Sequence, residues 1–224
     1  MEPNMWLGHT PHGRAYTMAV RPATSDWNTV NACAGTNDEY GIPEGVTGWA
    51  LDIGAHIGAW AIPFALDNPG VRVVCVEALP ENVVMLEQNI EQNGLTGRVM
   101  AVHAAAGATL DDATVYYSGD AHHRYIGNAD HPAGVAEGII VNGVSLSYLL
   151  QWPGDAGYGY MKIDCEGCEY SVFASPDVRR VGTIVGEVHR GWARLAELLE
   201  PTHELGGDGA DFGHFKAVRR SREP

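Results

Sequence analysis

The chain has 224 residues, of which 45% are hydrophobic and 19% charged, and this is enough for one globular domain with a sizeable core. Its formal net charge of −14 disfavours a nucleic-acid-binding protein, because such proteins present a basic surface to phosphates, although an acidic total leaves room for a local basic patch. The sequence contains no apolar run of about 20 residues that could cross a bilayer. Residues 1–10 have neither the basic start nor the apolar segment of a signal peptide. We therefore expect a cytoplasmic protein that acts on a small molecule, with no nucleic-acid or membrane partner.

Apolar runs alternate with helical patterns from residue 49 onward, which predicts an α/β fold with a doubly wound, mostly parallel sheet. The first strand is expected at 49–53. The helix after it is expected to begin near Gly58, and Pro63 would kink that helix because proline removes a backbone donor.

A second strand is predicted at 71–77, and Pro80 suits the first position of the helix that follows. This helix runs to Asn93 and places Val83, Leu86 and Ile90 on its inner face. The remaining predicted elements are strands at 98–103, 160–164, 183–188 and 212–218 and a helix at 192–200.

The stretch 107–159 is longer than a simple crossover requires. We expect an inserted hairpin within 108–145, with arms at 114–117 and 139–141, and then a short helix near 145–150. The polar, glycine-rich loop 118–131 is either a lid over the substrate or a surface loop without a role. The whole chain is expected to form a single domain, residues 1–224, in which residues 1–46 are an N-terminal cap.

Two strand ends carry acidic residues beside glycine turns, Asp52-Ile-Gly-Ala-His-Ile-Gly58 and Lys162-Ile-Asp-Cys-Glu-Gly-Cys-Glu169. In doubly wound sheets ligands bind at such carboxyl ends, so these segments are expected to form two walls of one pocket. The spacing Gly54-x-x-x-Gly58 fits a pyrophosphate poorly. Glu77, at the end of the second strand, is placed to accept hydrogen bonds from both hydroxyls of a ribose. The combination favours S-adenosylmethionine over a nicotinamide dinucleotide.

The chain has four cysteines, at positions 33, 75, 165 and 168. Cys165 and Cys168 form a CxxC pattern, but neither a thioredoxin-like context nor a second ligand pair accompanies it. We interpret both as small apolar residues that pack at a strand-to-helix turn.

Several of these segments resemble the FkbM-type methyltransferases. The resemblance covers about residues 20–190 and is carried by Asp52–Gly58, Glu77-Ala78, Ala104–Gly107, Lys162–Glu169 and Glu187-Val-His189, together with Thr24-Ser-Asp26 and Glu39-Tyr40. It implies a Rossmann-like class I methyltransferase fold, with a mostly parallel seven-stranded sheet, helices on both faces and a small hairpin insertion. It also implies methyl transfer from S-adenosylmethionine, most often to a hydroxyl oxygen of a natural product or sugar. The chain departs from the family at His56, where Asn is usual, at Ala78, which lacks a following Pro, at Pro63, and at Cys165 and Cys168.

We assign cofactor binding to Asp52, Gly54, Ala55, His56, Gly58, Glu77, Ala78, Ala105 and Asp164. His189 is the candidate general base, since imidazole titrates near neutrality, and Asp164 is expected to orient it or to bind the substrate. A divalent metal held by Asp164, Glu187 and His189 is an alternative that we do not favour. Lys162 is expected to be a scaffold residue paired with Glu166 or Glu169.

Three other functions remain open from the sequence. A nicotinamide-dependent oxidoreductase is disfavoured by the glycine spacing, and a non-catalytic S-adenosylmethionine-binding protein would keep the same pocket. A nucleic-acid methyltransferase is ranked low, because neither an Asn-Pro-Pro-Tyr-like element nor a basic composition is present. The acceptor pocket itself has no recognisable pattern; the loop 118–131 and an N-terminal group (Trp6, His9, His12, Arg14 and Trp27) are candidates to line it.

Overall fold

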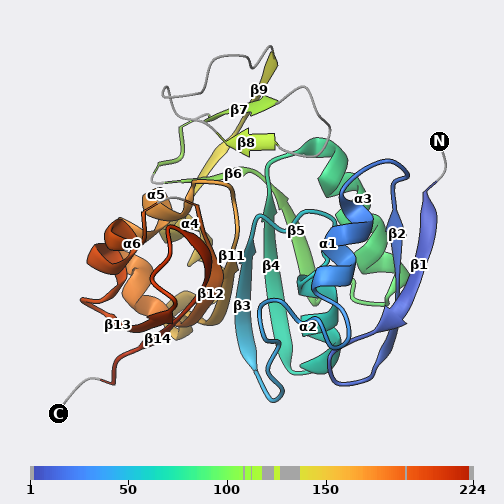
Figure 1. Ribbon diagram of the computed structural model, residues 1–224, viewed down its shortest axis with the longest axis horizontal. Coiled ribbons are helices and arrows are strands. Elements are labelled where there is room, and N and C mark those ends of the chain that lie inside the picture. The colour runs from blue at the N-terminus through green and yellow to red at the C-terminus, as the bar shows by residue number, and fades with distance from the viewer. Residues whose placement is uncertain are drawn as a thin grey trace.

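A computed structural model describes residues 3–107, 109–111, 113–117, 124–126, 137–189 and 191–221. Its centre is a seven-stranded sheet in the order β13-β14-β12-β11-β3-β4-β5 (Figure 1). The strands are β3 (Gly48–Ile53), β4 (Val71–Glu77), β5 (Val99–His103), β11 (Tyr158–Ile163), β12 (Val181–His189), β13 (His203–Gly207) and β14 (Phe212–Arg219). Neighbouring strands from β5 to β12 run parallel, whereas β14 is antiparallel to both β12 and β13. The predicted mostly parallel, seven-stranded class I methyltransferase sheet is confirmed.

Helices cover both faces of this sheet, and each face has its own apolar core (Figure 1). One face is packed by α1 (Asp26–Ala32), α2 (Ala61–Asp67) and α3 (Pro80–Gln92), and the other by α4 (Leu146–Leu149), α5 (Glu169–Phe173) and α6 (Trp192–Leu199). Two short 3₁₀ helices, η1 (Gly154–Ala156) and η2 (Pro176–Arg180), precede β11 and β12. No described helix has the length and apolar composition to span a membrane.

The expectation of a kink at Pro63 is wrong. Helix α2 begins at Ala61 rather than near Gly58, so Pro63 lies in its first turn. The backbone N–H groups of a first turn have no partner within the helix, and a proline there removes no hydrogen bond. By contrast, Pro80 does occupy the start of α3, and Val83, Leu86 and Ile90 are buried as expected.

The hairpin predicted within 108–145 is present. β7 (Ala113–Tyr117) pairs antiparallel with β9 (Glu137–Val141), and β8 (Arg124–Ile126) adds a third strand to this small sheet. Most of the loop 118–131 lies outside the described residues, so its role stays a prediction. The sequence did not indicate β6 (Ala105–Gly107) and β10 (Gly143–Ser145), which pair with each other, or strand β13.

The N-terminal segment packs against helix α3. Strands β1 (Asn4–His9) and β2 (Ala15–Val20) form a hairpin, and the side chain of Asn89 on α3 bonds to both backbone groups of Ala19 in β2. Trp6 and Met18 share a core with Leu86 of α3. This packing brings the start of α1 beside the carboxyl ends of β3 and β4.

Candidate functional site

A cavity of about 470 Å³ opens at the carboxyl ends of the parallel strands. Its walls come from the ends of β3, β4, β11 and β12, the start of α3 and the segment around α1. This volume falls within the usual range for small-ligand sites. The cavity is lined by Gly54, Ala55, His56, Glu77, Ala78 and Asp164 among the residues assigned to the cofactor, and also by Ala104 and Ala106.

Three of the assigned cofactor residues lie behind this lining. Asp52 is fully buried within β3, and Ala105 packs with Ala78 and Leu79 in a small apolar cluster. Gly58 has a φ of 90°, and a Cβ at this position would lie 2.8 Å from the side chain of Leu86, so it provides space for helix packing. These three residues shape the wall, and their contact with a cofactor stays a prediction.

The glycine turn after β3 is held by strand β4. The backbone N–H groups of Gly54 and Ala55 both donate to the carbonyl of Val76, so they are not directed at a ligand. Gly54 has a φ of 76°, and a Cβ there would lie 1.8 Å from the carbonyl oxygen of Asp164, which only glycine avoids. The turn is therefore pressed directly against the end of β11, as the two-wall interpretation requires.

The carboxylate of Glu77 joins the turn after β3 to the start of α3. Oε2 accepts the backbone N–H of His56 at 2.8 Å, while Oε1 accepts the N–H of Leu79 at 2.9 Å and Nδ2 of Asn82 at 3.2 Å. His56 has a left-handed backbone with a φ of 52°, a conformation in which Asn is favoured, and its ring Nε2 lies 3.4 Å from Asp26.

The predicted partners of Lys162 are wrong. Its ammonium donates to the carbonyl of Gly54 at 2.9 Å and lies 3.4 Å from Oδ1 of Asp52, away from Glu166 and Glu169. Burial alone would lower the pKa of Lys162, but Asp52 and Asp164 together raise it. Burial raises the pKa of Asp52 to about 6 despite the nearby ammonium. Lys162 is thus a scaffold cation that joins the two walls, as expected, by contacts that sequence spacing did not indicate.

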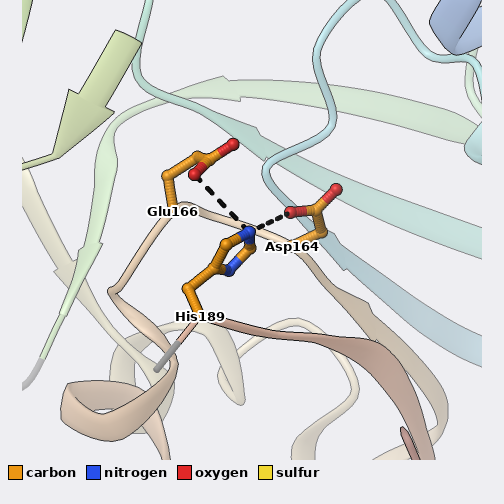
Figure 2. Close-up of side chains that lie close together, drawn as sticks. All are labelled: Asp164, Glu166 and His189. Atoms are coloured by element: carbon orange, nitrogen blue, oxygen red, sulfur yellow. Dashed lines mark ion pairs between the residues drawn. The ribbon is translucent and has the colours of Figure 1, made fainter. Parts of the chain in front are cut away.

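His189, the last residue of β12, lies at the centre of a carboxylate cluster (Figure 2). Its Nδ1 is 3.0 Å from Oε1 of the buried Glu169. Its Nε2 is 3.5 Å from Glu166, 3.7 Å from Asp164 and 3.8 Å from Glu187. Burial opposes protonation, but Glu169, Glu166 and Asp164 outweigh it and raise the pKa of His189 to about 9.

Asp164 therefore does not orient His189, because a separation of 3.7 Å exceeds a hydrogen bond. Glu169 does so instead. Asp164 accepts a hydrogen bond at Oδ2 from the hydroxyl of Tyr40, at 2.8 Å, which ties it to the N-terminal segment.

A possible metal cluster differs by one residue from the predicted set. Ligand atoms of Asp164, Glu166 and His189 lie within 4.8 Å of one another, so Glu166 takes the place given to Glu187. Glu187 still lines the cavity, and burial raises its pKa as it does that of Glu166. Metal binding here stays a prediction.

The interpretation of Cys165 and Cys168 as unlinked packing residues is wrong. Both are buried, but they form a disulfide, with their Cα atoms 5.5 Å apart. The bridge closes the turn over Glu166 and Gly167, both of which have positive φ values. This turn carries Asp164 and Glu169 at its two ends. The sequence motif was visible, but it could not show that the two sulfur atoms meet.

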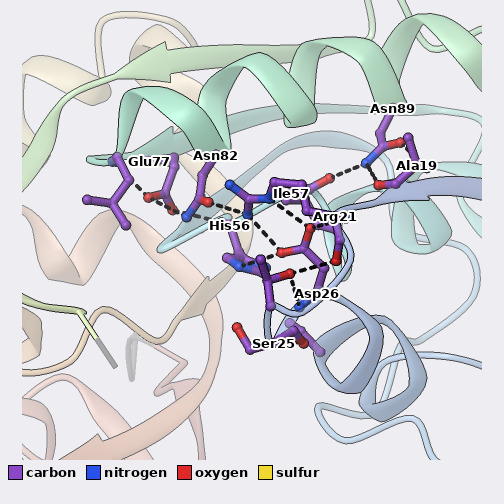
Figure 3. A network of polar contacts seen from close by, with 12 residues as sticks. Ala19, Arg21, Ser25, Asp26, His56, Ile57, Glu77, Asn82 and Asn89 are labelled. Carbon is purple, nitrogen blue, oxygen red and sulfur yellow. Dashed lines mark hydrogen bonds and ion pairs between the residues drawn. The ribbon is translucent and has the colours of Figure 1, made fainter. Parts of the chain in front are cut away.

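The N-terminal segment contributes residues that sequence reasoning missed. Arg21 and Asp26 form a bidentate ion pair beside the cavity, and Arg21 also donates to Oδ1 of Asn82 (Figure 3). Arg21, Asn82 and the indole of Trp60 line the cavity. None of the candidates Trp6, His9, His12, Arg14 and Trp27 does so. The resemblance of Thr24-Ser-Asp26 and Glu39-Tyr40 to the FkbM-type methyltransferases was the signal that pointed to this segment.

This sheet order, with one antiparallel strand next to its edge strand and a cavity at the carboxyl ends of the parallel strands, is that of the class I methyltransferase fold. The family model described as the methyltransferase FkbM domain matches residues 52–207. The match covers most of the chain, which therefore belongs to this family. S-adenosylmethionine is the cofactor of this methyltransferase, and the oxidoreductase alternative has no support.

Solved structures with a similar fold differ widely in sequence. The precorrin-6Y C5,15-methyltransferase of Geobacter metallireducens is 15% identical over 78% of this chain and 81% of its own, with a TM-score of 0.47. The N-terminal domain of human METTL16, in complex with SAH, is 12% identical over 79% of this chain and 63% of its own, with a TM-score of 0.45. A putative caffeoyl-CoA O-methyltransferase of Staphylococcus aureus is 11% identical over 76% of each chain, with a TM-score of 0.46. At such identities and scores, these structures carry no argument about the acceptor. No curated protein matches the chain.

Proposed function

We propose that this methyltransferase acts on a small molecule and methylates a hydroxyl oxygen, as of a natural product or sugar. The observation that carries the proposal is the arrangement at His189. One ring nitrogen is held by Glu169, and the other faces Asp164, Glu166 and Glu187, three side chains that line or border the cavity. An oriented imidazole beside a ligand cavity is suited to take the proton that an alcohol loses.

The lining fits S-adenosylmethionine. When bound, S-adenosylmethionine would supply a methyl group on a positively charged sulfur, and S-adenosylhomocysteine would leave as the neutral thioether once the methyl carbon is bonded to the acceptor oxygen. Glu77 offers a carboxylate to the ribose, and the small side chains of Ala55, Ala78, Ala104 and Ala106 leave room for the rest of the nucleoside. The carboxylates at the far end of the cavity favour a cationic ligand over an anionic one.

His189 acts as the general base once it has lost its own proton. At neutral pH its raised pKa of about 9 keeps the ring largely protonated, so the active form grows as the pH rises. Asp164, whose second oxygen is fixed by Tyr40, binds the acceptor hydroxyl. The alignment of that hydroxyl with the methyl carbon supplies much of the acceleration, because it removes orientational freedom.

A divalent cation at Asp164, Glu166 and His189 is the alternative way to activate the hydroxyl. A metal mechanism predicts that a chelator abolishes turnover and that a divalent ion restores it. Unchanged turnover after chelation, with the metal content verified by mass spectrometry, excludes it.

The decisive experiment is to incubate candidate hydroxylated metabolites with the protein and S-adenosylmethionine and to detect a product heavier by one methylene unit. Transfer of a labelled methyl group to any acceptor in a lysate separates an enzyme from a non-catalytic binding protein. Label recovered in nucleic acid rather than in small molecules would contradict the proposed substrate class. We also propose that the chain folds as one domain and acts in the cytoplasm.

A further inference from the structure

We infer that Asn82, held by Arg21, is a second ribose-binding residue beside Glu77. The inference rests on the proposed role of Glu77 at the cofactor ribose, and it deepens that role. Both Arg21 and Asp26 lie before residue 52, where the match to the family domain begins.

The hydrogen bonds already made by Glu77 leave it little free capacity. A carboxylate offers about four lone-pair positions, two on each oxygen. Oε1 accepts two hydrogen bonds, from Leu79 and Asn82, and Oε2 accepts one, from His56. One position on Oε2 therefore remains, which suits one ribose hydroxyl. The expectation that Glu77 accepts hydrogen bonds from both hydroxyls is not supported, and the second hydroxyl needs another partner.

Asn82 offers the missing group. Arginine has only donors, so the atom that accepts Nη2 of Arg21 at 2.6 Å is the amide oxygen of Asn82. The amide nitrogen must then point toward Glu77, where one of its two N–H groups donates to Oε1. No side chain or backbone group in the described part of the chain accepts the other N–H. Asn82 is 5% exposed and lines the cavity, so this N–H is available to a ligand there.

A vicinal diol matches this pair of groups. One hydroxyl donates to Oε2 of Glu77, and the oxygen of its neighbour accepts the free N–H of Asn82. An acceptor and a donor side by side discriminate a diol from a deoxy sugar more sharply than a carboxylate alone, because a missing hydroxyl leaves one buried group unpaired.

Arg21 is a positioning residue in this arrangement. Its guanidinium is fixed by two hydrogen bonds to Asp26, which is fully buried, and His56 approaches the same carboxylate (Figure 3). The contacts close a ring through Asp26, Arg21, Asn82, Glu77 and His56. Through Arg21, the N-terminal segment thereby sets the orientation of the Asn82 amide.

The test is calorimetric titration of the full-length protein with S-adenosylhomocysteine and with its 2′-deoxy and 3′-deoxy analogues. Asn82→Leu should weaken the parent ligand about five- to tenfold, the effect of one lost hydrogen bond. It should also remove the preference of the wild type for the parent over one of the two analogues. Steady-state kinetics of Asn82→Leu should show a raised KM for S-adenosylmethionine with kcat nearly unchanged.

The role of Arg21 is tested in a double-mutant cycle. Because Arg21→Met alone leaves the buried Asp26 carboxylate unpaired, Arg21→Met is combined with Asp26→Asn. This pair should weaken binding, and adding Asn82→Leu to it should have no further effect. Asn93→Leu is the matched control, because among the described residues the side chain of Asn93 bonds only to Thr17 and Asn89. Its loss should lower the melting temperature and leave affinity unchanged.

Wild-type affinity in Asn82→Leu, or fully additive effects in the cycle, would overturn the inference. Failure of the proposed function looks different. In that case Glu77→Ala also leaves S-adenosylhomocysteine binding intact, or the wild type does not bind it.

Discussion

The Nδ1 atom of His189 lies 3.0 Å from Oε1 of Glu169, a glutamate with no exposed surface. The same oxygen accepts the backbone N–H of Cys165 at 3.2 Å. Because a carboxylate can only accept, Nδ1 carries a hydrogen, and any lone pair of the ring is on Nε2. Nε2 is the nitrogen that faces Asp164 and Glu166, so Glu169 fixes which end of His189 can act as a base.

Turnover is expected to rise with pH. The pKa of His189 is raised to about 9, so the unprotonated ring becomes abundant only as the pH approaches that value. A profile of kcat that extends above pH 10 should climb with its midpoint near pH 9 and level off only above that value. His189→Gln should lower turnover by about 100-fold or more and leave S-adenosylhomocysteine affinity nearly unchanged. A flat profile in the wild type would exclude His189 as the base.

Replacement of Glu169 by Gln should move this pH profile. The hydrogen bond and the charge of Glu169 are the leading causes that raise the pKa of His189 against the effect of burial. Gln keeps an oxygen that can accept from Nδ1 but removes the negative charge. The rising limb of kcat should therefore shift to lower pH. Glu197→Gln is the control, since Glu197 lies on α6 outside the cavity lining. If the rising limb of kcat stays at the same pH in a folded Glu169→Gln protein, the assigned orientation of His189 is contradicted.

His189 should also make stability depend on pH. A pKa raised from about 6.5 in the unfolded chain to about 9 means that the folded state holds the proton more tightly. The stabilisation is fully present below pH 6.5 and is lost as the pH rises through 9. The difference in unfolding free energy between wild type and His189→Gln, measured by urea denaturation, should therefore shrink over this interval. A difference that grows with pH would show that the shift has the opposite sign.

Reduction of the Cys165–Cys168 disulfide should impair turnover. The bridge closes the turn that carries Asp164 and Glu169, and it restrains Glu166 in a left-handed conformation. A reductant should lower kcat in the wild type, whereas Cys165→Ala/Cys168→Ala should be less active and insensitive to reductant. Cys33 and Cys75 remain in that variant as buried free thiols, which are already reduced and do not respond to a reductant.

Glu77→Ala should weaken S-adenosylhomocysteine binding by at least tenfold, because it removes the ribose acceptor and also frees Asn82, Leu79 and the N–H of His56. Titration calorimetry measures this loss. NADH, titrated in parallel, should not bind the wild type. Tight NADH binding would contradict the cofactor assignment.

The strands and most helices followed from local patterns. Apolar runs placed β3, β4 and β12 to within two residues, and Pro80 marked the start of α3 because proline fits only a first turn. The expected kink at Pro63 was wrong because helix α2 begins at Ala61, three residues after the expected start, so Pro63 lies in its first turn and not in its interior. Start positions depend on packing as well as on the local sequence, and they are the weakest part of any such reading.

The sequence by itself determined the parallel sheet, the acidic residues at its strand ends, the glycine turn and the family to which these motifs belong. Each of these depends on residue type and short-range spacing. Only the tertiary structure decided the partners: Glu169 rather than Asp164 on His189, Asp52 rather than Glu166 on Lys162, and Asn82 between Arg21 and Glu77. Hydrogen bonds form between atoms that meet in space, and Arg21 and Asn82 are 61 residues apart along the chain. The contact depends on the packing of β2 against α3, which no local pattern specifies.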